Sequence, residues 1–338
     1  MKACQTQTVK GAADLSCANN SVSRYEFEKD MNERPQQHGT DMPAQWLDRM
    51  RSIGEAHGFY RPLGAAHAAL FIEENATLLV TFDNAQRLRP MGPDGFPVGF
   101  EMVEEHEYSM LSVFAEGATW FRDEALYAFF DGLADDGFFD QFDRVIFLGI
   151  GPSAGYAACA FSVAAPGAEV LASSPVATLD RADVPFESRF AKGRRLNFNA
   201  RYGFAPDLLG GASRAFLLFD LAGGLPAAHA ALFRAKHIHK IGLPRMGPHL
   251  ERLIIMGEGV GPLVEALAGE DAETCKELRD LLHERARADA GYLKSLMVEA
   301  LKRNHHSAAL RVARHGAEVT DDPIFARHIA SIGRGQNS

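Results

Sequence analysis

The chain has 338 residues, of which 46% are hydrophobic and 23% are charged, as in an ordinary globular protein. Its formal net charge of −9 gives no reason to expect nucleic-acid binding, and no apolar stretch approaches the roughly 18–20 residues needed to span a bilayer. Four cysteines without a CxxC pair favour a reduced, cytoplasmic protein over a disulfide framework or a metal site.

The first half of the chain leads up to a central strand. Residues 1–40 are polar, and we expect a poorly ordered N-terminal arm. After this arm the pattern predicts, in order, a helix at 43–57, strands at 68–72 and 76–82, a strand at 108–115, and an amphipathic helix between 123 and 142. Only Glu73, Glu74 and Asn75 separate the first two strands, which predicts a hairpin.

The segment Arg144 to Ala165 is the centre of the chain. The apolar run at 145–148 predicts a strand buried on both faces, and an alanine-rich helix follows the glycines. The turn between them fits two patterns. Gly151 to Gly155 reads as the nucleophile elbow G-x-S-x-G around Ser153. Gly149, Gly151 and Ala154 also read as the dinucleotide turn G-x-G-x-x-A.

The rest of the chain continues the alternation of strands and helices. The pattern predicts a strand at 169–172, an irregular excursion at 176–213, a strand at 214–220, a helix at 226–233, a strand at 237–243, and helices at 250–332. This order predicts an α/β fold with a mostly parallel central sheet and helices on both faces. The expected division is an arm at 1–40, an α/β domain at 41–255 and an all-helical C-terminal extension at 256–338.

The dinucleotide pattern lacks two usual companions. Such a turn normally follows the first strand of its fold, whereas at least three predicted strands precede this one. The next strand ends at Ser173-Ser174-Pro175, without an acidic residue to hold a ribose. Pro152 keeps some similarity to a flavin-binding turn. A flavin or NAD site is therefore an alternative, while the main expectation is a protein without a cofactor.

The elbow pattern has its companions in the required order. Asp220 ends the strand at 214–220, and His249 follows the next strand, so the chain presents serine, acid and histidine in sequence. On these residues the stretch of about 67–260 resembles the α/β-hydrolase family, especially bacterial α/β-hydrolase-like proteins with a helical C-terminal extension. The usual His-Gly pair after the early strand is missing, which leaves the first oxyanion donor open.

The resemblance implies a role for each residue. Ser153 would attack an acyl carbon, His249 would take its proton, and Asp220 would orient the imidazole, with Asp180 and Asp183 as rival acids. The backbone N–H of Ala154 and a group near Asn84 would bind the oxyanion. Ser153 can instead be a helix cap, and Asp220 and His249 ordinary strand-end and loop residues.

The excursion at 176–213 lies where hydrolases carry a cap. Its basic and aromatic residues include Arg189, Arg194, Arg195 and Tyr202. Of two interpretations we favour a solvated basic face; the other is a lid that favours an anionic or sugar-rich substrate. We predict a serine hydrolase or acyltransferase that acts on an ester-like bond of a small-molecule, acylated or carbohydrate substrate. The alternative is a catalytically inactive hydrolase-fold interaction module, whose C-terminal helices bind a protein partner or a second copy.

Overall fold

The computed structural model describes residues 42–88, 95–255 and 259–335. The predicted N-terminal arm lies outside these residues. Among the described helices, none combines the length and the apolar character that crossing a bilayer requires.

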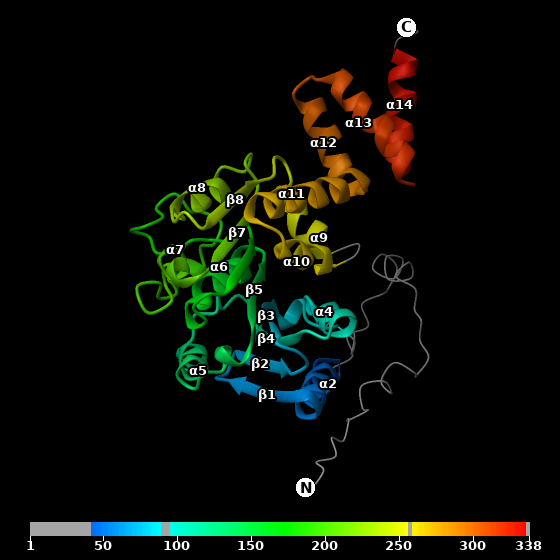
Figure 1. Ribbon diagram of the computed structural model, residues 1–338. Coiled ribbons are helices and arrows are strands. Elements are labelled where there is room, and N and C mark those ends of the chain that lie inside the picture. Colours follow the sequence, from blue (N-terminus) through cyan, green and yellow to red (C-terminus); the bar gives the residue numbers. More distant parts are fainter. Residues whose placement is uncertain (1–41, 89–94, 256–258, 336–338) are drawn as a thin grey trace, which may run out of the picture. The chain divides into compact units, whose positions relative to one another are not determined.

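One sheet of eight strands forms the centre of the described chain (Figure 1). Its strands are β1 Gly58–Leu63, β2 His67–Ile72, β3 Thr77–Asn84, β4 Ser109–Ala115, β5 Arg144–Ile150, β6 Glu169–Ser173, β7 Arg214–Phe219 and β8 Ile238–Gly242. They lie in the order β1-β2-β4-β3-β5-β6-β7-β8. The pairs β1–β2 and β2–β4 are antiparallel, and all others are parallel. The predicted mostly parallel α/β sheet is confirmed.

The predicted hairpin between the first two strands is wrong. β4 lies between β2 and β3, so the connection at Glu73 to Ala76 passes over one strand position instead of joining neighbours. The hairpin partner of β2 is β1, with Leu63 opposite His67. The sequence pattern did not reveal β1 because Arg61 and Pro62 interrupt its alternation, which an edge strand tolerates.

Helices cover both faces of the sheet, as predicted. They are α2 Met42–His57, α3 Ala85–Leu88, α4 Phe100–His106, α5 Glu124–Asp135, α6 Pro152–Phe161, α7 Ala205–Leu208, α8 Leu225–Leu232, α9 Leu250–Ile255, α10 Gly261–Glu265, α11 Asp271–Ala288, α12 Ala290–Lys302, α13 His306–Val319 and α14 Pro323–Gly335. β5 shows why two layers form. Ile146 and Leu148 face the cluster under α9 to α13, whereas Phe147 faces the cluster under α5 and α6.

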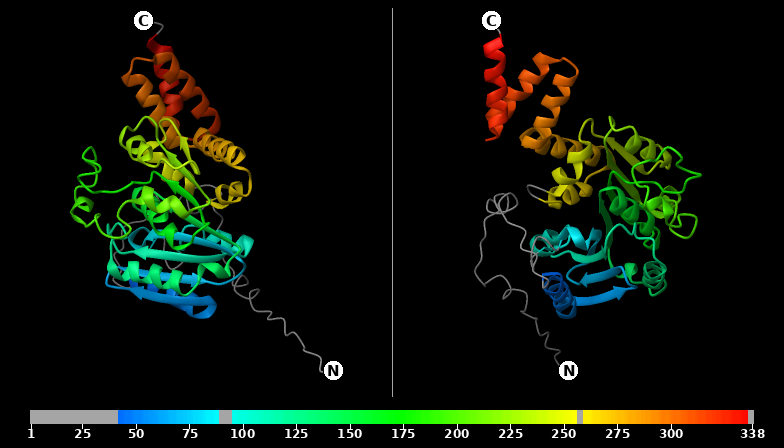
Figure 2. Two further views of the ribbon diagram at one scale, coloured as in Figure 1. Left: turned by 60° about the vertical axis from the view of Figure 1, so that its left-hand side comes forward. Right: turned by 180° about the vertical axis from the view of Figure 1, so that it is seen from behind.

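The C-terminal helices share a core with the sheet. Leu278 and Leu282 of α11, Met297 of α12 and Phe325 of α14 belong to the same buried cluster as Ile146 of β5. Figure 2 shows α11 to α14 following one another as neighbouring helices. The helical extension is confirmed, and its separation as a domain at residue 256 stays a prediction.

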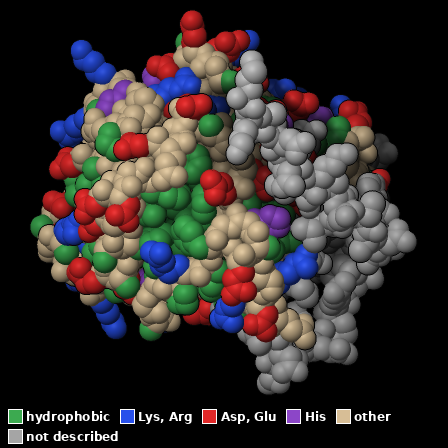
Figure 3. Space-filling model, turned by 60° about the horizontal axis from the view of Figure 1, so that its bottom comes forward, with side chains coloured by type: hydrophobic (Ala, Val, Ile, Leu, Met, Phe, Trp, Pro, Cys, Tyr) green, Lys and Arg blue, Asp and Glu red, His purple; other side chains and the backbone are tan. Residues whose placement is uncertain are grey.

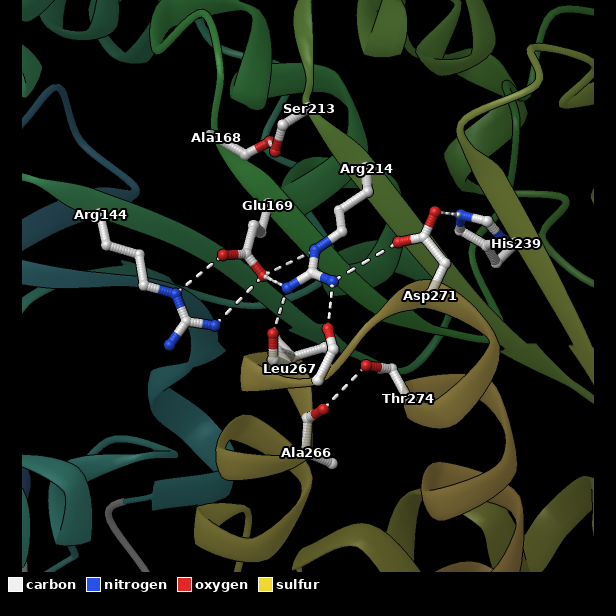
Figure 4. Close-up of polar contacts among 11 residues, drawn as sticks. Arg144, Ala168, Glu169, Ser213, Arg214, His239, Ala266, Leu267, Asp271 and Thr274 are labelled. Atoms are coloured by element: carbon white, nitrogen blue, oxygen red, sulfur yellow. Dashed lines mark hydrogen bonds and ion pairs between the residues drawn. The ribbon is translucent and has the colours of Figure 1, made fainter.

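A charge network closes the sheet edge where β5, β6 and β7 begin (Figure 4). The Glu169 carboxylate accepts from Arg144 Nε at 2.8 Å and from Arg214 Nη2 at 2.9 Å. Arg214 also donates to the Leu267 and Gly269 carbonyls, ahead of α11. The network therefore fastens α11 to the edge opposite the strand ends that carry the candidate site.

The side of the molecule that carries β1 exposes apolar surface. Figure 3 looks toward this side and shows hydrophobic side chains gathered among acidic and basic ones. Phe59 of β1, with Phe138 and Phe142 after α5, packs half-buried against the core cluster beneath α5 and α6. Native sheets blunt such an edge with charged residues and proline, and Arg61 and Pro62 of β1 are residues of this kind.

Candidate active site

A polar cavity of about 140 Å³ lies at the carboxyl ends of β3, β4 and β5. Its wall includes Asp83, Arg87, Thr119, Trp120, Ser153 and Glu251. Ligands of open α/β sheets bind at this edge, where the loops after parallel strands meet. The cavity is thus the place to look for the predicted chemistry.

The turn from β5 into α6 is built around two glycines. A Cβ on Gly149 would lie 2.2 Å from the Ala154 carbonyl oxygen, so only glycine allows the helix to approach the strand there. Gly151 directly follows β5 and has a φ of 96°, in the region that favours glycine. Ser153 is the second residue of α6 and follows Gly151 by two residues.

Because the bend falls at Gly151, Ser153 does not occupy the nucleophile position of an elbow. In a nucleophile elbow the reactive side chain stands on the strained residue between strand and helix, and the next residue donates its N–H to the oxyanion. Here the strained residue is Gly151, which has no side chain. The next residue is Pro152, which has no N–H. The strand-to-helix bend therefore carries neither a nucleophile nor the usual oxyanion donor.

Glu251 of α9 occupies the space above the bend. An ideal Cβ on Gly151 would lie 2.8 Å from the Glu251 Cδ and 2.9 Å from both carboxylate oxygens. Burial raises the pKa of Glu251, against the opposing charge of Arg87. The carboxylate lies beside the N-terminus of α6, where a negative charge is favoured and where a bound diphosphate would otherwise sit. This placement disfavours the flavin or NAD alternative at Gly149, Gly151 and Ala154.

Asp220 and His249 lie after the expected strands, but their side chains contact different residues and not each other. Asp220 Oδ1 accepts from the N–H groups of Ala222 and Arg245 at 2.8 and 2.9 Å, and Oδ2 accepts from Gly247 N–H at 3.0 Å. His249 Nε2 lies 2.8 Å from Ser295 Oγ of α12. Within the described residues, no hydrogen bond joins Asp220 to His249 or His249 to Ser153.

His249 lies half-buried beside the ion pair of Arg252 and Asp289. Burial and the Arg252 guanidinium, whose Nη2 lies 3.3 Å from His249 Nδ1, lower the histidine pKa, whereas Asp289 opposes the shift. Arg252 itself is paired with Asp289 at the start of α12. His249 therefore belongs to the contact between α9 and α12.

The strand order places these loops in a known architecture. The bend after β5, an acid after β7 and a loop after β8 stand at one edge of a sheet ordered β1-β2-β4-β3-β5-β6-β7-β8. The chain has the α/β-hydrolase fold.

Comparisons with known proteins find distant similarities only. No protein-family model matches this sequence, and no curated protein does. Acetyl xylan esterase 1 from Thermoanaerobacterium sp. JW/SL YS485 is 12% identical with a TM-score of 0.38, over 70% of this chain and 93% of its own. Est1E from Butyrivibrio proteoclasticus is 12% identical with a TM-score of 0.38, over 67% and 98%. The capsule O-acetyltransferase of Neisseria meningitidis serogroup A is 10% identical with a TM-score of 0.37, over 55% and 85%. These likenesses to esterases and O-acetyltransferases are distant.

The two predicted oxyanion residues do line the cavity of this α/β-hydrolase fold. The Asn84 side chain, however, is already engaged: its Nδ2 donates to the Gly117 carbonyl at 3.1 Å, and its Oδ1 accepts from Gln86 N–H at 2.9 Å. Ala154 is buried in the first turn of α6, whose leading N–H groups have no intrahelical acceptor. The Ala154 N–H is thus open to a donor role, and the Asn84 amide keeps its second N–H hydrogen for one.

The predicted cap residues lie away from the cavity wall. Arg189 makes a bidentate pair with buried Glu187, which also contacts His229 Nε2 at 2.9 Å. Arg194 donates to the carbonyls of Val184 and Glu187. The Tyr202 hydroxyl donates to Asp131 at 2.7 Å, and Arg195 is exposed. Arg189, Arg194 and Tyr202 therefore hold the excursion at 176–213 together, and their role toward a substrate stays a prediction.

The rival acids also lie in this excursion. Asp180 Oδ1 accepts from Ala182 N–H at 2.7 Å, which closes a tight turn. Asp183 is exposed. Neither residue belongs to the wall of the cavity.

Sequence reasoning missed a second hydroxyl in the cavity. Thr119, in the loop after β4, lies with its Oγ1 2.8 Å from His67 Nε2, and His67 Nδ1 lies 3.5 Å from Asp123 Oδ2. The three residues come from β2, a loop and the N-cap of α5, so no short motif announces them. The described residues hold no cluster of three or more histidine, cysteine or acidic side chains suited to a metal.

Proposed function

We propose that this protein binds a small, neutral, hydroxyl-bearing molecule in the cavity, and that it does so without an acyl-enzyme on Ser153. The observation that carries the second part is the pair Gly151 and Pro152 at the bend after β5. Ser153, two residues after Gly151, lies in the first turn of α6. Its backbone is helical, so it lacks the strained conformation by which an elbow exposes its nucleophile.

The charges of the cavity support a neutral ligand. Asp83 is buried and already paired, because its Oδ1 lies 2.5 Å from Arg87 Nη2 and its Oδ2 accepts from Val98 N–H at 3.0 Å. Glu251 adds a second carboxylate, for which the described residues provide no hydrogen bond or ion pair, only the more distant charge of Arg87. A ligand carboxylate or phosphate would meet this negative charge at the start of α6.

The remaining wall suits a short acylated sugar or polyol. Glu251 and Thr119 offer hydrogen-bonding oxygens, while Trp120 and Phe121 are buried aromatics on which an apolar ring face or acyl group can pack. A few convergent polar groups on an aromatic wall are common in small-molecule sites, which usually measure roughly 300–1,000 Å³. At about 140 Å³ this cavity would hold one end of such a ligand, with the remainder in solvent.

A second candidate function is the serine hydrolase or acyltransferase acting on an ester-like bond. Its specific support is that Ser153 lines the cavity together with Ala154. It requires a general base, and His249 would have to leave Ser295 to provide one. The interaction module that uses the C-terminal helices stays a prediction beside it.

Ligand-observed NMR tests the proposal. Saturation-transfer signals are expected from methyl glucoside and its 6-O-acetyl ester, but not from sodium acetate, with the wild-type chain. Glu251→Gln removes the charge at nearly constant shape, and acetate binding is then expected to appear. Glu299→Gln, in an exposed pair on α12, is the matched control. Acetate binding to the wild-type chain, or no binding of either glucoside, would contradict the proposal.

A further inference from the structure

Three side chains from separate elements meet behind the cavity wall. His67 begins β2, which runs antiparallel, so it lies opposite Ala115 at the end of β4 and at the cavity edge of the sheet. Thr119 Oγ1 contacts its Nε2 at 2.8 Å, and Asp123 Oδ2 lies 3.5 Å from its Nδ1. His67 is only 6% exposed, whereas Thr119 is half-buried and lines the cavity. Thr119 thus lies between the cavity and the His67 imidazole.

The surroundings of the two ring nitrogens indicate which one carries the proton. Nε2 is hydrogen-bonded to Thr119, whereas Nδ1 has the longer contact of 3.5 Å with Asp123 and no hydrogen bond among the described residues. Nδ1 faces a carboxylate, and two lone pairs would repel there, so the tautomer with its proton on Nδ1 is favoured. Nε2 is then an acceptor, and it takes the hydrogen bond from the Thr119 hydroxyl. The Thr119 oxygen in turn accepts from Phe121 N–H at 3.1 Å. This is the arrangement of a hydroxyl nucleophile, a general base and an orienting acid.

The loop that carries Thr119 is strained. Trp120 and Phe121 have φ angles of 56° and 54°, in the left-handed region that bulky residues avoid. Such strain persists where the surroundings impose it, most often at functional sites. The Asn84 amide contributes by donating to the Gly117 carbonyl in the same loop. Backbone strain therefore lies directly beside Thr119.

We propose that Thr119 is the reactive hydroxyl of this cavity, with His67 as its general base and Asp123 as the positioning residue of His67. The inference rests on the proposed ligand, because it assigns the acyl group of that ligand to Thr119. Thr119 Oγ1 attacks the acyl carbon of an ester while its proton passes to His67 Nε2, and the alcohol then leaves with that proton. In the second half, water attacks the acyl-threonine, His67 takes the water proton, and the threonine oxygen leaves and recovers it.

A purely structural role would use the same contacts to lock the loop at 116–122. The two roles differ in reactivity, not in stability. The test is therefore acetyl transfer from p-nitrophenyl acetate to the full-length protein, followed by release of p-nitrophenol and by peptide mapping of the acetylated residue. Thr119→Ala, Thr119→Ser and His67→Gln are the variants. Thr77→Ala, at the opposite end of β3, is the matched control.

The expected result is a burst of p-nitrophenol, with the acetyl group on the peptide that contains Thr119. General-base catalysis contributes roughly 10²–10⁴-fold, so Thr119→Ala and His67→Gln should slow acetylation at least about 100-fold. Thr119→Ser should restore it, and Thr77→Ala should not change it. Because His67 is buried, His67→Gln is interpreted only if its circular dichroism matches the wild type, and Thr119→Ala decides the question otherwise.

The failures of the two proposals can be told apart. Acetylation of Ser153 or of lysines alone, or a Thr119→Ala variant as fast as the wild type, overturns the role of Thr119. Binding of the acetylated glucoside would still be seen by NMR in that case. Loss of the NMR signal, by contrast, overturns the proposed ligand whatever p-nitrophenyl acetate does.

Discussion

The carboxylate of Glu251 lies where a side chain on Gly151 would project, with 2.8 Å between its Cδ and an ideal Cβ at that position. The two residues come from α9 and from the bend after β5, about 100 residues apart in the chain. Glycine and glutamate are therefore matched to each other, since any larger residue at 151 would displace the carboxylate.

Placing a serine at the bend should not create an esterase. Gly151→Ser forces a φ of 96° on a residue with a Cβ and crowds Glu251, so we expect a loss of about 1–3 kcal/mol in the free energy of unfolding. Activity on p-nitrophenyl acetate should not rise, because Pro152 offers no N–H to the oxyanion. Urea denaturation and the hydrolysis rate measure both. Gly210→Ser is the control, since nothing lies within 4 Å of its Cβ. A variant that gains activity would show that Pro152 does not disable the bend.

Removing the charge of Glu251 should stabilise the protein at neutral pH. Burial raises the pKa of Glu251 above its usual 4.5, so the ionised form costs stability in the folded state, and this cost grows as pH rises through the folded pKa. Glu251→Gln should therefore raise the melting temperature by about 2 °C at pH 7, and by nothing below pH 4.5. Equal gains at both pH values would mean that the charge is not responsible.

Acid should loosen the excursion at 176–213 through Glu187 and His229. Burial opposes ionisation of Glu187, but the bonds from Arg189 and His229 hold its pKa at about 2. Burial lowers the pKa of His229, against the opposing effect of Glu187. Ionised Glu187 therefore stabilises the fold above its usual pKa of 4.5, and neutral His229 does so above its usual pKa of 6.5. Both contributions are lost as pH falls through the lower pKa values of the folded state.

Glu187→Gln tests this acid sensitivity. It leaves Arg189 without its carboxylate, so we expect a loss of about 3 kcal/mol at pH 7 that shrinks below pH 4.5. Urea denaturation across this range is the measurement, with Asp48→Asn in an exposed pair as the control. A loss that is the same at every pH would assign the effect to packing instead of charge.

Breaking the charge network at the opposite sheet edge should detach α11. Glu169→Gln leaves Arg144 and Arg214 without their shared carboxylate, and we expect a loss of about 2 kcal/mol in the free energy of unfolding. Glu299→Gln, in an exposed pair with Arg303, should cost no more than about 0.5 kcal/mol. Hydrogen exchange should quicken in the first turns of α11 if Arg214 holds the Leu267 and Gly269 carbonyls as described. Unchanged exchange there would contradict this view of the network.

The sheet was predictable where strands are buried on both faces. The runs at 145–148, 169–172 and 214–219 have few alternatives, because short apolar runs bounded by polar and turn residues favour buried strands. Strand order was not predictable in the antiparallel part. β2 and β3 are close in sequence, but β4 fits between them, and only the pairing of whole strands decides this.

The sequence predicted the sheet edge that carries the cavity, but not the residue at which the strand-to-helix bend falls. The edge after β5 is where the cavity lies, and Ser153 lines it, as the elbow pattern suggested. Three glycines within seven residues leave the bend free to fall at Gly151 or two residues later, and the end of β5 at Ile150 decides for Gly151. Glu251 and the pair Thr119 and His67 belong to no motif, because their closeness arises only when distant strands pair.

The bend after β5 carries no nucleophile, and labelling with a fluorophosphonate probe tests this most directly. The full-length protein is treated with the probe, and the labelled residue is located by peptide mapping. We predict that Ser153 carries no label, and that any adduct in the cavity is on Thr119. A stoichiometric adduct on Ser153 that Ser153→Ala abolishes would contradict the account and restore the serine acyl-enzyme.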